Sequence, residues 1–244
     1  MEKIYEKKMQ IPNVAVDCFG RMKKSWLLAC LQEVAGEHCT LLGANSGEYE
    51  GRNLFWAVSR YRVEITRLPG AKETITLNTW PCPTTRVAYP RATVAYDEGG
   101  RELFRAMSLW VLMDVQSRAM ILPGKSGVVV DGITTGEEIA APISLPPVAG
   151  GNSQMRQVRF TDLDVNGHMN NTQYLNWVDD LLSSDYHRNH TPKEMTVCYL
   201  NEALEGQNLE LVWEQEEDLR LDAVCQDSAD AGKKHRIFAV KVKY

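Results

Sequence analysis

The clearest pattern of apolar positions lies in the second half of the chain. Large apolar side chains recur there at helical spacing over about four turns, at Tyr174, Trp177, Val178, Leu181 and Leu182. Such a stripe is typical of a helix that buries one face along its length. Asn170 or Asn171 can accept a hydrogen bond from the first turn, and Gln173 stands three residues after Asn170, as in a capping box. The pattern predicts one buried helix over residues 171–186.

A second stripe predicts a helix over residues 26–42 in the first half. Ser25 can cap its start and Gly43 can end it. Its apolar face consists of Leu27, Leu31, Val34, Ala35, His38 and Leu42. The position of His38 on this face favours a core or pocket-wall residue over a ligand. Strand-like segments surround the helix, at 3–10, 54–65, 74–80, 89–97 and 103–114.

The same order of elements returns after a segment rich in glycine and proline. Residues 123–151 show little periodicity and predict a linker. Beyond it, strands are expected at 155–160, 195–203, 209–214, 219–226 and 235–244. A strand, a long helix and four further strands, given twice, predict an α+β fold with a curved antiparallel sheet around each helix. Alternation within 54–65 places Tyr61, Val63 and Ile65 on the core face of the first sheet.

Composition and charge narrow the class of protein. The 244 residues are 44% hydrophobic and carry a formal net charge of −5, which suits a globular chain and argues against a general nucleic-acid binder. The N-terminus is charged where a signal peptide needs an apolar core, and no apolar run reaches membrane-spanning length, so we expect a cytoplasmic protein without membrane insertion. The cysteines are scattered without a C-x-x-C pair, which favours reduced core thiols. We expect no metal and no cofactor.

The candidate chemistry is concentrated just before the second helix. A carboxylate, a carboxamide and an imidazole occupy every second position, at Asp164, Asn166 and His168, so in an extended segment all three would project to one side. A helix start next to such a cluster could stabilise an oxyanion, which fits hydrolysis of an acyl group. The alternative is that these residues are simple caps and turn formers. The first half has no Asn or His at the matching positions.

Several ordered segments resemble the acyl-acyl carrier protein (acyl-ACP) thioesterases, which have two hot-dog domains in tandem. The resemblance spans most of the chain, and its most specific part is the segment 162–171. Other landmarks are Glu33 and the segments 52–60, 78–80 and 108–113. The resemblance implies an N-terminal hot-dog domain over 1–122 with an acyl-chain pocket, a linker over 123–151 and a catalytic hot-dog domain over 152–244. Because the chain lacks the transit peptide and longer N-terminal region of plant members, we expect the compact bacterial type.

The resemblance also implies a catalytic network of Asp164, Asn166 and His168, completed by a glutamate on the following strand. Glu202 is the best match for that glutamate. Plant members usually have a cysteine directly after it, whereas this chain has Ala203, so a cysteine nucleophile is ruled out at that site. Glu202 would activate water as a general base, and direct attack by its carboxylate to form an anhydride is the less favoured version.

In that mechanism Asn166 and His168 would hold the water or polarise the thioester, assisted by backbone N–H groups at the helix start. Asp164 would orient Asn166 or the loop. The expected reaction is hydrolysis of fatty acyl-ACP to free fatty acid, which ends chain elongation in fatty acid biosynthesis. The expected partner is the acidic acyl carrier protein, with Lys23, Lys24, Arg86 and Arg91 as docking candidates. We expect a monomer or homodimer.

Other functions stay open at this point. A hot-dog enzyme that hydrolyses acyl-coenzyme A, or that dehydrates a hydroxyacyl chain, would use a similar architecture. A non-catalytic acyl-binding module is the alternative from another class, and it would bind acyl chains without releasing free fatty acid.

Overall fold

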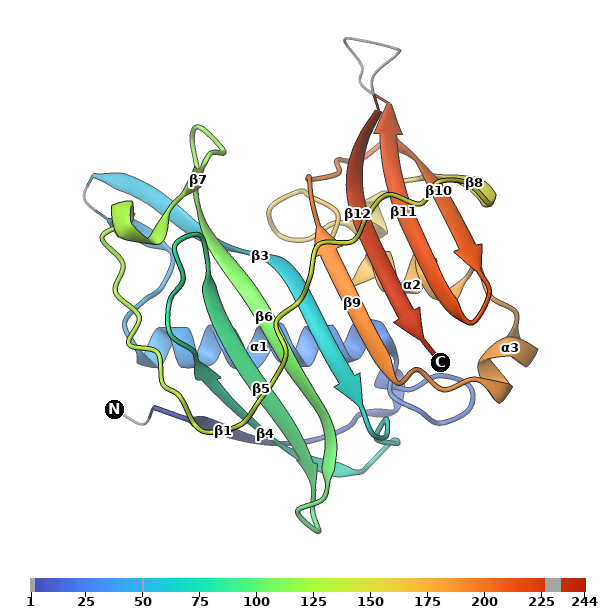
Figure 1. The fold of residues 1–244 in the computed structure, drawn as a ribbon, viewed down its shortest axis with the longest axis horizontal. Coiled ribbons are helices and arrows are strands. Elements are labelled where there is room, and N and C mark those ends of the chain that lie inside the picture. The colour runs from blue at the N-terminus through green and yellow to red at the C-terminus, as the bar shows by residue number, and fades with distance from the viewer. Residues whose placement is uncertain (1–2, 50, 227–233) are drawn as a thin grey trace. The chain divides into compact units, whose positions relative to one another are not determined.

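The structure is a computed structural model that describes residues 3–49, 51–226 and 234–244. The chain forms two compact units, Met1–Pro142 and Ile143–Tyr244, which we call unit 1 and unit 2. The division falls inside the predicted linker, while the predicted limits at 122 and 152 remain predictions. Each unit contains an antiparallel sheet with a helix on one face (Figure 1).

Unit 1 is built around the long helix α1 (Lys24–Leu41). Its sheet has the strand order β1-β4-β5-β6-β3, and β2 and β7 extend it by pairing with β3 and β6. The strands are β1 (Tyr5–Gln10), β2 (Gly47–Tyr49), β3 (Arg52–Ile65), β4 (Thr74–Pro81), β5 (Tyr89–Asp97), β6 (Glu102–Asp114) and β7 (Met120–Ile121). Two short 3-10 helices complete it, η1 (Asn13–Ala15) and η2 (Pro123–Lys125).

The sheet of unit 1 is covered on both faces. On the α1 face the alternation predicted for β3 is confirmed, because Tyr61, Val63 and Ile65 are buried. On the opposite face lies an apolar cluster of buried side chains, Trp80, Ala92, Val94 and Met107. Ile133 and Ile139, from the segment after η2, pack against this cluster. The first part of the predicted linker is therefore part of the core of unit 1.

Unit 2 repeats the plan with shorter helices. Its sheet has the strand order β9-β12-β11-β10-β8. The strands are β8 (Asn152–Gln157), β9 (Glu194–Tyr199), β10 (Asn208–Gln215), β11 (Asp218–Gln226) and β12 (Lys234–Lys243), and the helices are η3 (Phe160–Asp162), α2 (Gln173–Asp179) and α3 (Ser184–Asn189). Tyr174 of α2 stacks on Phe238 of β12 with ring centroids 4.7 Å apart. This contact fixes the apolar face of α2 on the sheet.

The prediction of one continuous helix over 171–186 is wrong. The helical segment breaks after Asp179 and restarts at Ser184. Ser183 explains the break, because its hydroxyl oxygen accepts a hydrogen bond from Tyr186 N at 3.1 Å and so caps a new helix. The apolar pairs Tyr174–Trp177 and Leu181–Leu182 thus belong to a helix and a turn.

The predicted caps also differ from the structure. Ser25 lies inside α1, which begins at Lys24, and its side chain is buried instead of capping the helix. Asn170 Oδ1 does accept from Thr172 N at 2.9 Å, but Gln173 Oε1 accepts from Asn176 Nδ2 at 2.7 Å and forms no capping box. Strand β9 ends at Tyr199, four residues before its predicted end.

Candidate active site

The segment from Asp164 to His168 forms a tight turn, not the extended run that the sequence predicted. Asp164 N donates to His168 O at 2.8 Å and closes the turn. Asp164 Oδ1 accepts from Asn166 N at 2.8 Å and from His168 N at 3.3 Å. Gly167 has φ +77°, a conformation that glycine adopts without strain. The Asp164 carboxylate therefore lies beneath the turn and holds its backbone.

Glu202 reaches this turn from the segment that follows β9. Met169 N donates to Ala203 O at 2.8 Å, and His168 forms a β-bridge with Leu204. These contacts place Glu202 beside the turn, with Glu202 Oε2 3.6 Å from His168 Nε2. The structure thus brings together two residues that lie far apart in the sequence and that the sequence analysis assigned to one network.

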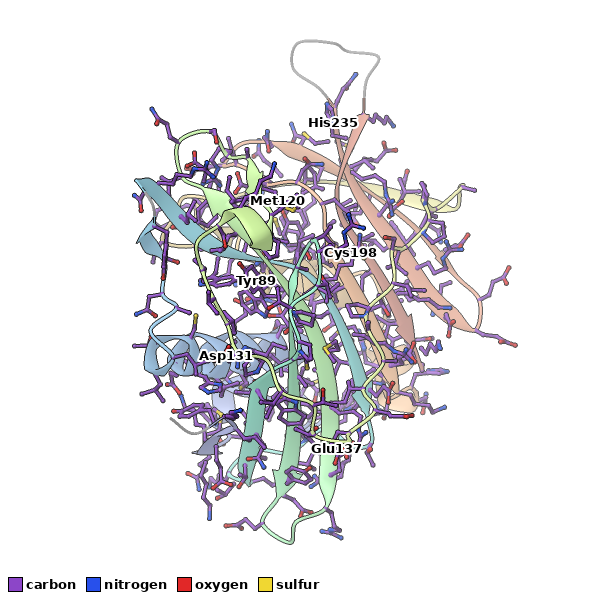
Figure 2. All side chains as sticks on the ribbon, turned by 60° about the vertical axis from the view of Figure 1, so that its left-hand side comes forward. Tyr89, Met120, Asp131, Glu137, Cys198 and His235 are labelled. Carbon is purple, nitrogen blue, oxygen red and sulfur yellow. The ribbon has the colours of Figure 1, made fainter. Side chains whose placement is uncertain are left out.

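The Glu202–His168 pair is accessible to solvent. Their side chains are 46% and 23% exposed, respectively. A separation of 3.6 Å is longer than a hydrogen bond, but two atoms at this distance can both contact one water molecule at about 2.8 Å. Glu202 also lines an open cleft in unit 2, of about 760 Å³, which extends to Lys234 and His235 (Figure 2, His235 labelled). Glu202 thus borders this cleft, whereas His168 and Asn166 are not among the described residues that line it.

Asn166 is less well fixed than the other three residues. Its side chain is exposed, and its Nδ2 lies 3.4 Å from Asp164 Oδ2, at the long limit of a hydrogen bond. Asp164 therefore contacts both the loop backbone and the Asn166 amide, the two roles that the sequence left open. The carboxamide can turn toward a substrate at little cost.

The backbone N–H groups of the turn before α2 are bonded within unit 2, while the predicted contribution of N–H groups at the start of the helix itself stays a prediction. The N–H groups of residues 166–170 all donate to oxygens within unit 2: Asp164 Oδ1 twice, Asp164 O, Ala203 O and Asp162 O. They are occupied and cannot stabilise an oxyanion. Helix α2 has only 7 residues, which also limits the field at its N-terminus. The role of the Asn166 and His168 side chains in polarising a carbonyl stays a prediction.

Unit 1 contains the same turn at the matching place in its sequence. Asp17 Oδ1 accepts from Phe19 N at 2.8 Å and from Arg21 N at 3.0 Å. Asp17 N donates to Arg21 O at 2.8 Å, and Gly20 has φ +77°. Phe19 and Arg21 thus occupy the places of Asn166 and His168.

The segments that face the two turns also correspond. In each unit two successive N–H groups after the strand donate to one carbonyl oxygen of the neighbouring strand, those of Thr66 and Arg67 in unit 1 and of Leu200 and Asn201 in unit 2. Pro69 O and Ala203 O then accept from the methionine after each turn, Met22 and Met169. This register places Leu68, which is buried, where unit 2 has Glu202. The same backbone arrangement, here called the backbone frame, occurs in both units. Of the two, unit 2 carries Glu202, His168 and Asn166 on it.

Two of the predicted docking candidates are not available on the surface. Arg91 and Lys24 are 7% and 5% exposed, because β5 turns Arg91 toward α1 and the first turn of α1 packs against the core. Lys23 donates to Val14 O at 3.1 Å and is partly exposed, while Arg86 is exposed. The prediction of an exposed docking patch made of all four residues is therefore wrong.

The remaining candidates for chemistry are accounted for by structure. Cys198 is buried and its Sγ lies 3.6 Å from Ile143 O. Asp162 accepts from Arg159 N at 2.9 Å and from Trp177 Nε1 at 3.3 Å, and so holds the loop before α2. Among the described residues, no cluster of His, Cys, Asp and Glu could hold a metal ion. No helix in the described part of the chain is long and apolar enough to cross a membrane.

Comparisons with known proteins give a consistent result. The sequence matches two family models, the acyl-ACP thioesterase N-terminal domain over residues 2–122 and the acyl-ACP thioesterase C-terminal domain over residues 147–244. It is 29% identical to the chloroplastic palmitoyl-acyl carrier protein thioesterase of Gossypium hirsutum over 191 residues, which cover 72% of this chain and 46% of the relative. It is 27% identical to the chloroplastic dodecanoyl-[acyl-carrier-protein] hydrolase of Cinnamomum camphora, over 70% of this chain and 49% of that protein. The chain spans about half the length of these relatives.

Similar folds are known from solved structures. An acyl-ACP thioesterase from Bacteroides thetaiotaomicron has a TM-score of 0.80 and 22% identity, with 99% of this chain and 97% of that one covered. A 12:0-ACP thioesterase from Umbellularia californica has a TM-score of 0.77 and 20% identity, with 100% and 97% covered. At this level of identity the likeness concerns the fold, and it confirms the predicted α+β double hot-dog fold.

Proposed function

Because this chain belongs to the acyl-ACP thioesterase family, we propose that it hydrolyses the thioester of fatty acyl-acyl carrier protein and releases free fatty acid. In a cell this reaction would end chain elongation in fatty acid biosynthesis, in the cytoplasm. The observation that carries the proposal is the contact between Glu202 and His168, 3.6 Å apart on a frame that unit 1 repeats without either residue.

The proposed chemistry starts from a water molecule beside this pair. Glu202 removes a proton from the water while the water oxygen bonds to the thioester carbonyl carbon. The carbonyl π electrons move to the carbonyl oxygen. His168 and Asn166 donate hydrogen bonds to that oxygen or to the water. The carbonyl then re-forms, the carbon–sulfur bond breaks, and Glu202 returns the proton to the departing sulfur. The net reaction consumes one water and yields a carboxylic acid and a thiol.

Each side chain has its own role in this mechanism. Glu202 is the general base, a role typically worth about 10²- to 10⁴-fold in rate. Each oxyanion donor is typically worth about 10²- to 10³-fold. Asp164 acts through the turn, because its carboxylate holds the backbone that presents Asn166 and His168. It is a positioning residue.

Unit 1 supplies an apolar cavity for the acyl chain in this proposal. The cavity is lined by side chains from α1, β3, β5 and β6, among them Ala35, Trp56, Tyr89 and Trp110. Burial of methylene groups there would contribute about 0.8 kcal/mol each. The partner would be the acyl carrier protein, and Lys23 and Arg86 remain as candidates for contact with its acidic surface.

The test is a direct assay of the purified chain. It would be incubated with a ladder of acyl-acyl carrier protein thioesters and, in parallel, with the same acyl groups on coenzyme A, and released acids would be identified by mass spectrometry. We expect free fatty acid from the carrier thioesters at a higher kcat/KM than from coenzyme A. Tight binding of the acyl chain without release of acid would identify a non-catalytic module and overturn the proposal.

A further inference from the structure

The cavity of unit 1 has a volume of about 150 Å³. Its lining is mainly apolar and includes Ala35, Cys39, Trp56, Tyr89 and Trp110 (Figure 2, Tyr89 labelled). A cavity of this size can hold a molecule such as benzene, about six carbon atoms. It can therefore take the far end of an acyl chain, but not a long one.

One wall of this apolar cavity carries a buried cation. The Arg91 side chain lines the cavity and is only 7% exposed. Burial lowers the pKa of its guanidinium to about 10, so the group is still charged at neutral pH. No carboxylate of the described residues forms an ion pair with it. A buried charge without a counter-ion is costly.

Within the described part of the chain, the side-chain hydrogen bonds of Arg91 use one of its three nitrogens. Nη1 donates to His38 Nδ1 at 3.0 Å and to Thr79 Oγ1 at 3.3 Å. Because a guanidinium group only donates hydrogen bonds, His38 Nδ1 is the acceptor and carries no proton. Thr79 Oγ1 also accepts from Thr93 Oγ1 at 2.9 Å and donates to Ala92 O at 2.9 Å. The guanidinium is thus held through Nη1, and Arg91 lines the cavity while the described residues give no hydrogen-bond partner to its Nε and Nη2.

A second donor lies on the same lining. Gln32, on α1, lines the cavity, and its buried Nε2 forms no hydrogen bond of good geometry in the described part of the chain, although it lies close enough to the Tyr61 hydroxyl to act on the pKa of that group. An unsatisfied buried donor costs free energy that a suitable acceptor would recover. A methyl-ended acyl chain offers no acceptor, so the Arg91 N–H groups that the described residues do not bond would stay unsatisfied.

We propose that this cavity selects acyl chains that carry an oxygen near their far end, either a hydroxyl group or a carboxylate, and that this oxygen accepts hydrogen bonds from Arg91 and Gln32. The proposal rests on the proposed thioesterase function and adds the substrate class. Sites built to bond a substrate oxygen discriminate strongly against the analogue without it, because the buried donors are then left unpaired.

The experiment measures kcat/KM of the purified full chain on thioesters that differ only at the far end of the acyl group. Acyl groups of six to twelve carbons, ending in a methyl, a hydroxyl or a carboxylate, would be joined to N-acetylcysteamine, so that docking of a carrier protein plays no part. We expect the best hydroxyl- or carboxylate-ended chain to have a kcat/KM at least about tenfold above the best methyl-ended chain. The two oxygenated series identify which acceptor is used.

Two variants assign any preference to Arg91. Arg91→Met keeps the length of the side chain but removes the donors, and should abolish the preference. Arg67→Met is the matched control, because Arg67 is exposed and pairs with Glu73 at 2.8 Å, and it should keep the preference. Equal kcat/KM for oxygenated and methyl-ended chains, or a preference that survives in Arg91→Met, overturns the proposal.

A binding measurement keeps this test separate from the proposed catalysis. Trp56 and Trp110 line the cavity, so their fluorescence reports its occupation by non-hydrolysable amide analogues of the same chains. If no thioester is hydrolysed, the proposed thioesterase function is wrong. The selectivity is still supported in that case if oxygenated amides bind more tightly to the unsubstituted chain than to Arg91→Met. Equal binding of all amides overturns it.

Discussion

Glu202 and Leu68 occupy the same place on a backbone frame that the chain contains twice. In unit 1 the leucine is buried, and the facing turn carries Arg21. In unit 2 the glutamate is partly exposed and lies 3.6 Å from His168. Because the backbone is alike in both units, the side chains alone distinguish a structural loop from a candidate site.

The shared aspartate of the two turns can be tested for its role in each. Asp164→Ala and Asp17→Ala each remove a carboxylate that accepts two backbone N–H bonds. Each should lower the free energy of unfolding by about 0.5–2 kcal/mol, measured in urea. Only Asp164→Ala should also reduce kcat, because only its turn presents Asn166 and His168. Equal loss of kcat in both variants would contradict the assignment.

Some residues of the candidate site could be predicted from the sequence and others could not. The spacing of Asp164, Asn166 and His168 was visible, and the resemblance added Glu202. The turn geometry was not visible, because alternation alone does not show that Gly167 adopts a positive φ. The charge of Arg91 suggests a docking residue on the surface, but its place on one strand face with Tyr89 and Thr93 buries it.

At the scale of elements, the agreement with the sequence differs from one element to the next: helix α1 lies within two residues of its predicted bounds, while β8 begins three residues before its predicted start. Strand β5 has the predicted bounds, Tyr89–Asp97, and its C-terminal end is marked in the sequence by the glycine-containing turn at 97–100. The apolar spacing over 171–186 predicts one helix, because it does not reveal that Ser183 caps a second one. Strands as short as β2 and β7 give too few positions for any period to be seen.

Gly36 of α1 gives a test at this scale. It lies within the helix and on the cavity lining, and a Cβ added there would meet nothing within 4 Å. Gly36→Ala should therefore raise the free energy of unfolding by about 0.5–1 kcal/mol, because alanine favours the helix. Gly36→Leu should instead shift hydrolysis toward shorter acyl chains, since its side chain would enter the cavity. Lower stability of Gly36→Ala, or an unchanged length preference in Gly36→Leu, would contradict this description of the cavity.

At the scale of the whole molecule, the segment between the sheets is more than a connection. Residues 126–142 pack on unit 1, where Ile133 N donates to Pro81 O at 2.9 Å. Residues 143–151 contact unit 2, where Val148 N donates to Asp222 Oδ2 at 2.8 Å. The composition predicted a surface linker because glycine and proline are frequent, but it did not show that Val128 would be buried.

The close packing of this segment can be tested at Gly132. A Cβ at that position would lie 2.1 Å from Cys82 O, a backbone atom that cannot move aside easily. Gly132→Ala should destabilise unit 1 by about 1–3 kcal/mol and lower the melting temperature by about 2–4 °C per kcal/mol. Gly124→Ala is the control, because its Cβ would meet nothing within 4 Å. Similar melting temperatures for the two variants would show that the segment is not packed as described.

The central claim is that Glu202 and His168 act together in thioester hydrolysis. A double-mutant cycle tests it most directly, with kcat/KM measured on an acyl-acyl carrier protein thioester for Glu202→Gln, His168→Ala and the double variant. Arg21→Ala, at the matching place in unit 1, serves as the control and should retain normal activity.

Residues that act as one unit show losses that do not multiply. We predict that each single variant loses about 10²-fold or more and that the double variant is little slower than the slower single one. Losses that multiply in full, or folded single variants with unchanged kcat/KM, would contradict the account.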